Sequence, residues 1–142
     1  MTGTARRPTV HPLHGTLLAF PMALFPSAVA SDIAYLKTAE LQWTNFSAWL
    51  ISGGLVFGGL VTAWALLALL FGLRGAERVR RLIYFAALAV MWILGLVNAF
   101  KHSQDGWSSV GAFGLGLSIL TSLLALAAGM LAFSGFGRDS AR

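Results

Sequence analysis

The segment Ser47–Leu73 reads SAWLISGGLVFGGLVTAWALLALLFGL and contains no charged residue. A bilayer core about 30 Å thick is crossed by roughly 20 apolar residues, because a helix rises about 1.5 Å per residue. The segment lacks the alternation of apolar and polar residues that marks the strands of a membrane barrel. Backbone polar groups in lipid must find partners within the segment, and a helix provides them. The sequence therefore predicts a transmembrane helix at 47–73.

Three further segments have the same character, namely 13–36, 82–100 and 108–134. The first contains one charged residue, Asp32, and the other two contain none. The whole chain of 142 residues is 57% hydrophobic and 11% charged, whereas soluble domains average roughly 45–50% apolar and about 25% charged residues. We therefore predict a single membrane domain, an all-α four-helix transmembrane bundle joined by short loops.

The positive charges predict its orientation. With four spans, both chain ends and the loop between the second and third spans lie on one side of the membrane. That side receives most of the ten Lys and Arg residues, and the positive-inside rule assigns it to the cytoplasm. We therefore expect both termini in the cytoplasm of a bacterial inner membrane protein. The residues on this side are Arg6, Arg7, Arg74, Arg78, Arg80, Arg81, Arg138 and Arg142, against Lys37 and Lys101 on the other.

The N-terminal segment also has features of a secretory signal peptide. Two arginines precede an apolar stretch, and Ala28-Val29-Ala30 has the small residues of a cleavage site. The apolar run, however, continues beyond Ala30 to Leu36. We expect an uncleaved first helix.

Several function classes are disfavoured by residue types and motifs. The chain has no Cys, which rules out thiolate metal sites and iron–sulfur clusters within it. It also lacks GxSxG, HExxH and Walker A motifs. These absences favour a non-catalytic protein without a metal site. The pI near 10.8 follows from the orientation signal, so no nucleic-acid partner is needed to explain it.

Small residues are predicted to hold the helices together, because membrane helices associate through close packing of such residues. Gly54 and Gly58 form a GxxxG pair in the second span, and Gly114, Ser118 and Ser122 follow one another at i, i+4 spacing in the fourth. These faces would pack the four helices against one another. The alternative is that they join a second copy of the chain or a larger membrane complex.

The first span contains Pro21 and Pro26. Each proline lacks an N–H, which frees the carbonyl of the residue four positions earlier and is expected to kink the helix. The hydroxyl of Ser27, a neighbouring helix or water would supply the missing donor. A kinked first helix would give the bundle a groove.

His11 and His14 lie near the cytoplasmic start of the first span and are candidate cofactor contacts. A haem b between helices takes two imidazoles from opposite faces, and these two histidines lie on one helix. The third histidine, His102, is predicted across the membrane. An isolated monomer is therefore expected to bind no haem, although a homodimer or partner could complete a site; quinone or lipid headgroup contact is the other functional interpretation.

Asp32, Asn98 and His102 are the polar candidates near the outer side. Asp32 lies close to the outer end of its span, where it could reach interfacial water or Lys37, or pair with His102 or Asn98 on the third span. A proton relay through Asp32 would need a second carboxylate or His at membrane depth, and the sequence predicts none there. A small transporter or channel using Asp32 and the kinked helix remains an alternative function.

The run His11-Pro12-Leu13-His14, followed by Phe20-Pro21 and Asp32, resembles the opening HPxH…FP…D pattern of a family of small bacterial four-helix membrane proteins of unknown function. The resemblance covers most of the chain and implies that these residues matter together. It also implies a redox setting, with sugar dehydrogenases of the sorbosone type that use PQQ and cytochrome-like modules as neighbours. Typical members carry a His early in the third span, whereas residues 81–86 here contain none.

These observations lead to one functional hypothesis and two alternatives. The chain is expected to be a non-catalytic membrane subunit of a respiratory or periplasmic dehydrogenase system, contacting quinone or haem near His11 and His14. The alternatives are the transporter using Asp32 and a ligand-free structural or assembly subunit of a larger complex. The expected partners of the protein are the lipid bilayer and either a protein subunit of a membrane complex or a second copy of the chain.

Overall fold

A computed structural model of the chain contains four long helices, in the order α1 (Pro12–Thr38), α2 (Leu41–Leu70), α3 (Ala76–His102) and α5 (Ala112–Phe133). The structure describes residues 10–72, 75–104 and 110–134. Leu73 and Ser108, which end or begin predicted spans, lie outside these ranges, as do Trp107 and the arginines at 6, 7, 74, 138 and 142. All four helices are long and apolar enough to cross a membrane.

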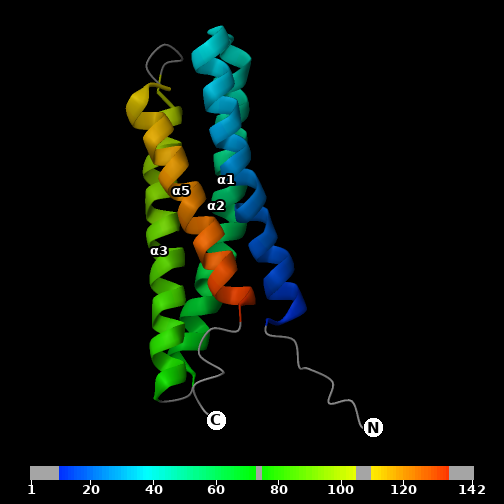
Figure 1. The fold of residues 1–142 in the computed structure, drawn as a ribbon, viewed down its shortest axis with the longest axis vertical. Helices are drawn as coiled ribbons and strands as arrows, with labels where there is room; N and C mark the ends of the chain where they lie inside the picture. Colours follow the sequence, from blue (N-terminus) through cyan, green and yellow to red (C-terminus); the bar gives the residue numbers. More distant parts are fainter. Residues whose placement is uncertain (1–9, 73–74, 105–109, 135–142) are drawn as a thin grey trace.

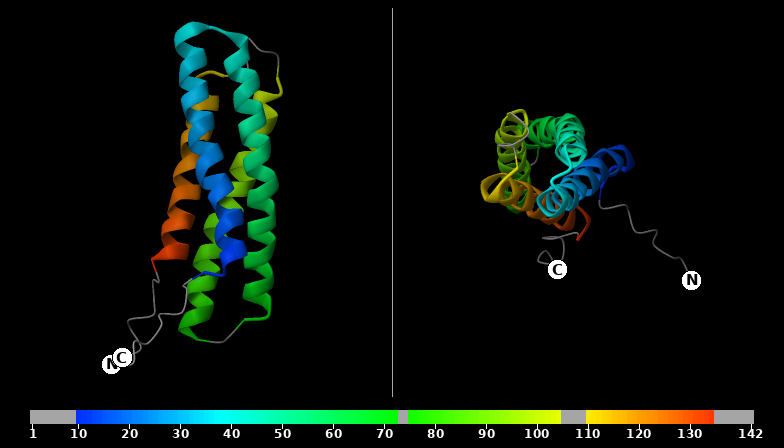
Figure 2. Two further views of the ribbon diagram at one scale, coloured as in Figure 1. Left: turned by 90° about the vertical axis from the view of Figure 1, so that its right-hand side faces the viewer. Right: turned by 90° about the horizontal axis from the view of Figure 1, so that it is seen from above.

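The helices form an antiparallel bundle with a square cross-section (Figures 1 and 2). Each helix packs beside the next along the chain, and α5 returns to pack beside α1. Consequently α1 and α3 lie at opposite corners, run in the same direction and begin at the same end of the bundle (Figure 2). We call this end, where α1 begins and α5 finishes, the inner end, and the opposite end the outer end. The charge pattern predicts that the inner end faces the cytoplasm.

The middle of the bundle is an apolar core. Leu18 and Phe25 of α1 meet Leu88 and Met91 of α3 there, and all four side chains are at most 1% exposed. Large apolar side chains on the other faces point outward, among them Val56, Leu60 and Ile93. An apolar surface of this kind is the one that lipid solvates, because lipid tails are as apolar as Leu. The predicted all-α four-helix membrane bundle is confirmed.

Helix α1 runs through both of its prolines without interruption. Pro21 is buried against the bundle, whereas Pro26 is half-buried. The Ser27 hydroxyl donates to the carbonyl of Ala23 at 2.8 Å, and not to the Met22 carbonyl that Pro26 leaves free. Of the three donors considered for that carbonyl, the structure therefore excludes Ser27, because a serine hydroxyl in a helix returns to the carbonyl four residues before it.

The small residues of α2 face into the bundle. A Cβ on Gly54 would lie 2.8 Å from the ring of Phe25, and one on Gly58 would lie 3.2 Å from the methyl group of Met91. The predicted stripe of α5, Gly114, Ser118 and Ser122, is also buried. The two faces thus bring neighbouring helices into close contact inside one chain, and they are covered there.

We expect Gly54→Ala to lower the free energy of unfolding by about 1–3 kcal/mol, because the added methyl group overpacks the Phe25 ring. Gly116→Ala is the matched control, since a Cβ there meets nothing within 4 Å and alanine favours a helix by about 1 kcal/mol. Unfolding in mixed micelles, followed by circular dichroism, measures both. Equal stability of the two variants would contradict the close Gly54–Phe25 contact.

Candidate functional site

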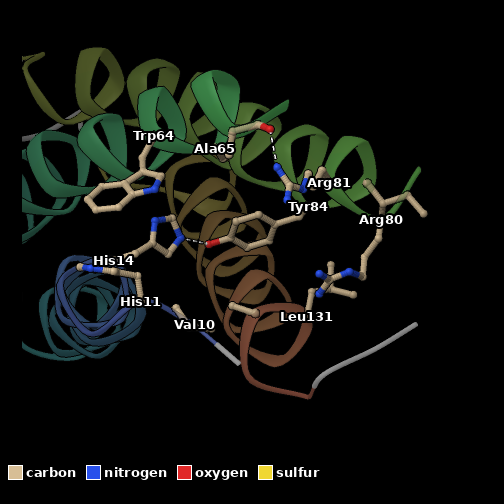
Figure 3. Close-up of a pocket in the computed structure, with 12 residues that line it drawn as sticks. Val10, His11, His14, Trp64, Ala65, Arg80, Arg81, Tyr84 and Leu131 are labelled. Atoms are coloured by element: carbon tan, nitrogen blue, oxygen red, sulfur yellow. Dashed lines mark hydrogen bonds between the residues drawn. The ribbon is translucent and has the colours of Figure 1, made fainter. Parts of the chain in front are cut away.

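A cavity of about 280 Å³ opens at the inner end of the bundle. Residues from all four helices line it, and Figure 3 shows the main ones. His11 and His14 come from α1, Trp64 from α2 and Tyr84 from α3, while the end of α5 closes the other side with apolar groups. The cavity is lined by aromatic rings together with a few converging polar groups. This composition is typical of small-molecule sites.

The imidazole of His14 is the central polar group of this cavity. Its Nε2 lies 2.7 Å from the Tyr84 hydroxyl, and its ring meets the Trp64 indole edge-on with ring centres 5.3 Å apart. The Nδ1 atom is buried and has no hydrogen-bond partner. His14 therefore has an unused hydrogen-bonding position next to the cavity. A buried polar atom without a partner costs free energy, so a bond made there would be favourable.

His11 is held differently. It caps α1, and its Nδ1 accepts a hydrogen bond from the backbone N–H of Leu13 at 3.3 Å. Its ring also lies against Trp64, with ring centres 5.5 Å apart. Because Pro12 occupies the first turn, where its missing N–H is not needed, the His-Pro-x-His sequence begins the helix and places both imidazoles on the same indole.

Two arginines of α3 supply the positive charge of the cavity. Arg81 donates from Nη1 to the carbonyl of Ala68 at 2.6 Å, which satisfies one of the carbonyls left open at the end of α2. Arg80 pairs with Glu77 at 2.9 Å, and its Nε is buried without a partner. The site therefore holds one unused donor, Arg80 Nε, in addition to the unpartnered Nδ1 of His14.

The cavity does not fit a haem iron. His14 already uses Nε2 toward Tyr84, and its Nδ1 is closed off from the surface. His11 lies on the same helix as His14, and His102 lies at the outer end. The described residues therefore offer no pair of imidazoles on opposite faces of one ring. Within the described ranges, no group of three or more His, Asp or Glu residues is placed to hold a metal ion.

A second polar cluster lies buried at the outer end and joins three helices. Asp32 Oδ1 lies 3.0 Å from His102 Nε2, and Asp32 Oδ2 accepts a hydrogen bond of 2.6 Å from Ser118. Asn98 donates from Nδ2 to the Ser118 oxygen at 2.9 Å. Asp32 and Asn98 are 0% exposed. Asp32 therefore contacts His102 and Ser118 and does not reach interfacial water, while Lys37 is exposed.

The His102 ring is fixed at both nitrogens. Its Nδ1 lies 3.0 Å from the carbonyl oxygen of Asn98, and its Nε2 faces Asp32. The prediction that no second carboxylate or His accompanies Asp32 at membrane depth was wrong, because the His102 side chain is buried inside the bundle with Asp32 and is not at the interface. One atom of the cluster, Asn98 Oδ1, is buried without a partner.

The two polar sites have a common geometry. His14 and Tyr84 are 70 residues apart in sequence, and so are Asp32 and His102. Because α1 and α3 run in the same direction at opposite corners, these pairs bridge the diagonal of the bundle at its two ends. They lie about 27 Å apart along a straight helix, and the apolar core separates them.

The sequence predicted some of these residues and missed others. His11, His14, Asp32, Asn98 and His102 were named, and the structure brings them into two groups. Tyr84 was not named as a site residue, yet its hydroxyl lies 2.7 Å from His14 Nε2. Trp64, Arg80 and Arg81 were not assigned to a site. Their positions relative to α1 depend on how each helix is rotated, which their spacing alone does not specify.

A family model described as "Predicted membrane protein (DUF2231)" matches residues 10–134. The match spans all four helices and both polar sites. The chain belongs to this DUF2231 family. No match was found among curated proteins or solved structures. As a DUF2231 protein with four helices able to span a bilayer, the chain is a multi-pass membrane protein in contact with lipid, consistent with the inner membrane.

Proposed function

We propose that this DUF2231 protein is a non-catalytic membrane subunit of a respiratory or periplasmic dehydrogenase system, and that it holds a quinone head group in the inner cavity. The observation that carries the proposal is the convergence of His14, Tyr84 and Trp64 on a cavity of about 280 Å³. A flat ring with two carbonyl acceptors suits an aromatic wall beside hydrogen-bond donors.

Each side of the cavity has a distinct role in this proposal. The Trp64 indole would stack against the quinone ring, and aromatic contacts of this kind add to the burial of apolar surface. The Tyr84 hydroxyl and the guanidinium of Arg80 would donate to the quinone oxygens. When the Tyr84 hydroxyl donates to a quinone oxygen, a neutral His14 donates from Nε2 to the Tyr84 oxygen, so its Nδ1 is an acceptor and makes no bond to the quinone. The chain's own contribution is binding and orientation; the redox chemistry belongs to the quinone and the dehydrogenase.

The geometry favours this function over the alternatives. A transporter using Asp32 would need that carboxylate to meet water, whereas it is 0% exposed and both of its oxygens are engaged. An assembly subunit that binds through its glycine faces would need those faces at the surface, but Gly54 and Gly58 are covered inside the bundle.

Quenching of tryptophan fluorescence tests the proposal directly. Decylubiquinone titrated into the protein in lipid nanodiscs is expected to give a saturable component from Trp64, above the linear quenching of lipid-facing tryptophans by partitioned quinone. Trp64→Phe should remove that component and leave the linear part. A Trp49→Phe control, at an indole that is 73% exposed, should keep it. Linear quenching alone in the unmodified protein would overturn the proposal.

A further inference from the structure

The hydrogen bonds around Asp32 and His102 determine which atoms of this buried pair carry a proton. Ser118 donates its hydroxyl proton to Asp32 Oδ2, because it simultaneously accepts from the amide of Asn98. Asp32 Oδ2 is therefore an acceptor. Any proton that Asp32 carries toward α3 has to be on Oδ1, which faces His102.

The contacts of the His102 imidazole determine where its hydrogens lie as well. His102 Nδ1 faces the carbonyl oxygen of Asn98 at 3.0 Å, and a carbonyl can accept but not donate. Nδ1 therefore carries a hydrogen. The second nitrogen, Nε2, lies 3.0 Å from Asp32 Oδ1. Without a further proton, a lone pair of nitrogen would face a carboxylate oxygen in a site closed to water, and that arrangement is repulsive.

One additional proton between Asp32 Oδ1 and His102 Nε2 completes both residues. The pair is then neutral as a unit, either as carboxylic acid and imidazole or as carboxylate and imidazolium. No other charged side chain among the described residues bonds to Asp32. Lys37 is exposed, and Lys101 donates to Gln104. The proton is therefore what compensates the charge of a carboxylate that is 0% exposed.

We propose that Asp32 and His102 form a proton-binding site that holds one exchangeable proton between α1 and α3 at the outer end of the bundle. His102 is the last residue of α3, so the pair lies at the outer end of the bundle, where both side chains are 0% exposed. Toward the inner end lies the apolar cluster that includes Phe25, Leu88 and Met91, and it contains no ionisable side chain. The site therefore exchanges its proton at the outer end, independently of the quinone cavity.

Nitrogen NMR of His102 tests the proposal. The double variant His11→Gln/His14→Gln leaves His102 as the sole histidine of the chain, so ¹⁵N-histidine labelling reports on it alone. In nanodiscs at neutral pH, Nδ1 is expected to be protonated. Either Nε2 is protonated too, or the infrared spectrum shows a carboxylic-acid band that Asp32→Asn removes. Exchange into D2O is expected to remove the N–H proton resonance or to shift the carboxylic-acid band.

Three results would overturn the proposal. The first is an unprotonated Nε2 together with an ionised Asp32, and the second is an unprotonated Nδ1. The third is an N–H resonance or a carboxylic-acid band that prolonged exposure to D2O leaves unchanged. If the double variant fails to fold, the same spectra are obtained by subtracting those of His102→Gln from those of the unmodified protein. Failure of quinone binding leaves these outcomes unchanged, because the two sites are separated by the apolar core.

Discussion

Replacement of Asp32 by Ala is expected to lower the free energy of unfolding by about 3–5 kcal/mol, the cost of removing one partner from a buried ionisable pair. Asp32 is hydrogen-bonded to both α3 and α5, through His102 and Ser118. In the Ala variant, His102 Nε2 and the Ser118 hydroxyl both lose their partner in a region that is closed to water. A small cavity adds to the loss.

Asp32→Asn is the matched control for this prediction. The amide keeps the shape of the carboxylic acid: its oxygen accepts from Ser118, and its nitrogen donates to a neutral His102 Nε2. We therefore expect the Asn variant to lie within about 1 kcal/mol of the unmodified protein, since its hydrogen bonds are exchanged and not lost. Unfolding in mixed micelles, followed by near-ultraviolet circular dichroism, separates the two variants.

The result would be contradicted if the Ala and Asn variants were equally stable. Equal stability close to that of the unmodified protein would mean that the outer cluster does not hold the helices together. Equal and strong destabilisation would mean that the charge of Asp32, and not its hydrogen bonds, stabilises the bundle. Ser118→Ala removes one hydrogen bond of 2.6 Å to Asp32 and keeps the Asp32–His102 pair. Its free energy of unfolding is expected to lie between those of the Ala and Asn variants of Asp32.

The architecture followed from the sequence because its cause is local and strong. Four charge-poor segments and a bilayer permit few folds, and short loops require neighbouring helices to be antiparallel. The buried position of Asp32 did not follow in the same way. The interface and the interior lie within one helical turn of each other near a span end, so spacing left contact with water, Lys37 or His102 open.

The rotation of each helix about its axis is what the sequence left undetermined. Helix α1 has little contrast between apolar and polar faces, so its pattern does not say which side meets α3. Ser118 illustrates the consequence. Its i, i+4 spacing from Gly114 and Ser122 indicated helix packing, and all three residues are indeed buried. Its hydroxyl, however, also donates to Asp32, which no periodicity of α5 indicates.

Tyr84 was missed for a related reason. A tyrosine near the end of a membrane span is usually an interfacial anchor, and nothing in residues 81–86 distinguishes it from one. In the structure, the Tyr84 hydroxyl bonds to His14 at 2.7 Å, so a hydrogen-bonding group faces His14.

Tyr84→Phe is expected to weaken the saturable binding of decylubiquinone about tenfold. The substitution removes one hydroxyl and keeps the ring, so the cavity retains its shape. A hydrogen bond contributes about 0.5–1.5 kcal/mol, and about 1.4 kcal/mol corresponds to a tenfold change in the dissociation constant. The hydroxyl also holds the His14 ring in place, because it is the sole hydrogen-bond partner of that imidazole among the described residues. Both effects act in the same direction.

Stability should change along with affinity. Without the Tyr84 hydroxyl, His14 Nε2 joins Nδ1 as a buried nitrogen with no partner, which costs about 1–3 kcal/mol. A double-mutant cycle with His14→Leu separates the causes. If the hydrogen bond carries the effect, Tyr84→Phe should cost much less stability in the His14→Leu background than in the unmodified protein. Additive effects would show that the two residues act independently.

Tyr35→Phe controls for the loss of a tyrosine hydroxyl elsewhere in the bundle. Tyr35 is the other tyrosine of the chain and is buried near the outer end of α1, far from the cavity. Its substitution is expected to leave the dissociation constant for decylubiquinone unchanged, whatever it does to stability. If Tyr84→Phe binds the quinone as tightly as the unmodified protein does, the His14–Tyr84 pair takes no part in holding the head group. Equal weakening by both substitutions would instead attribute the loss to a general loosening of the bundle.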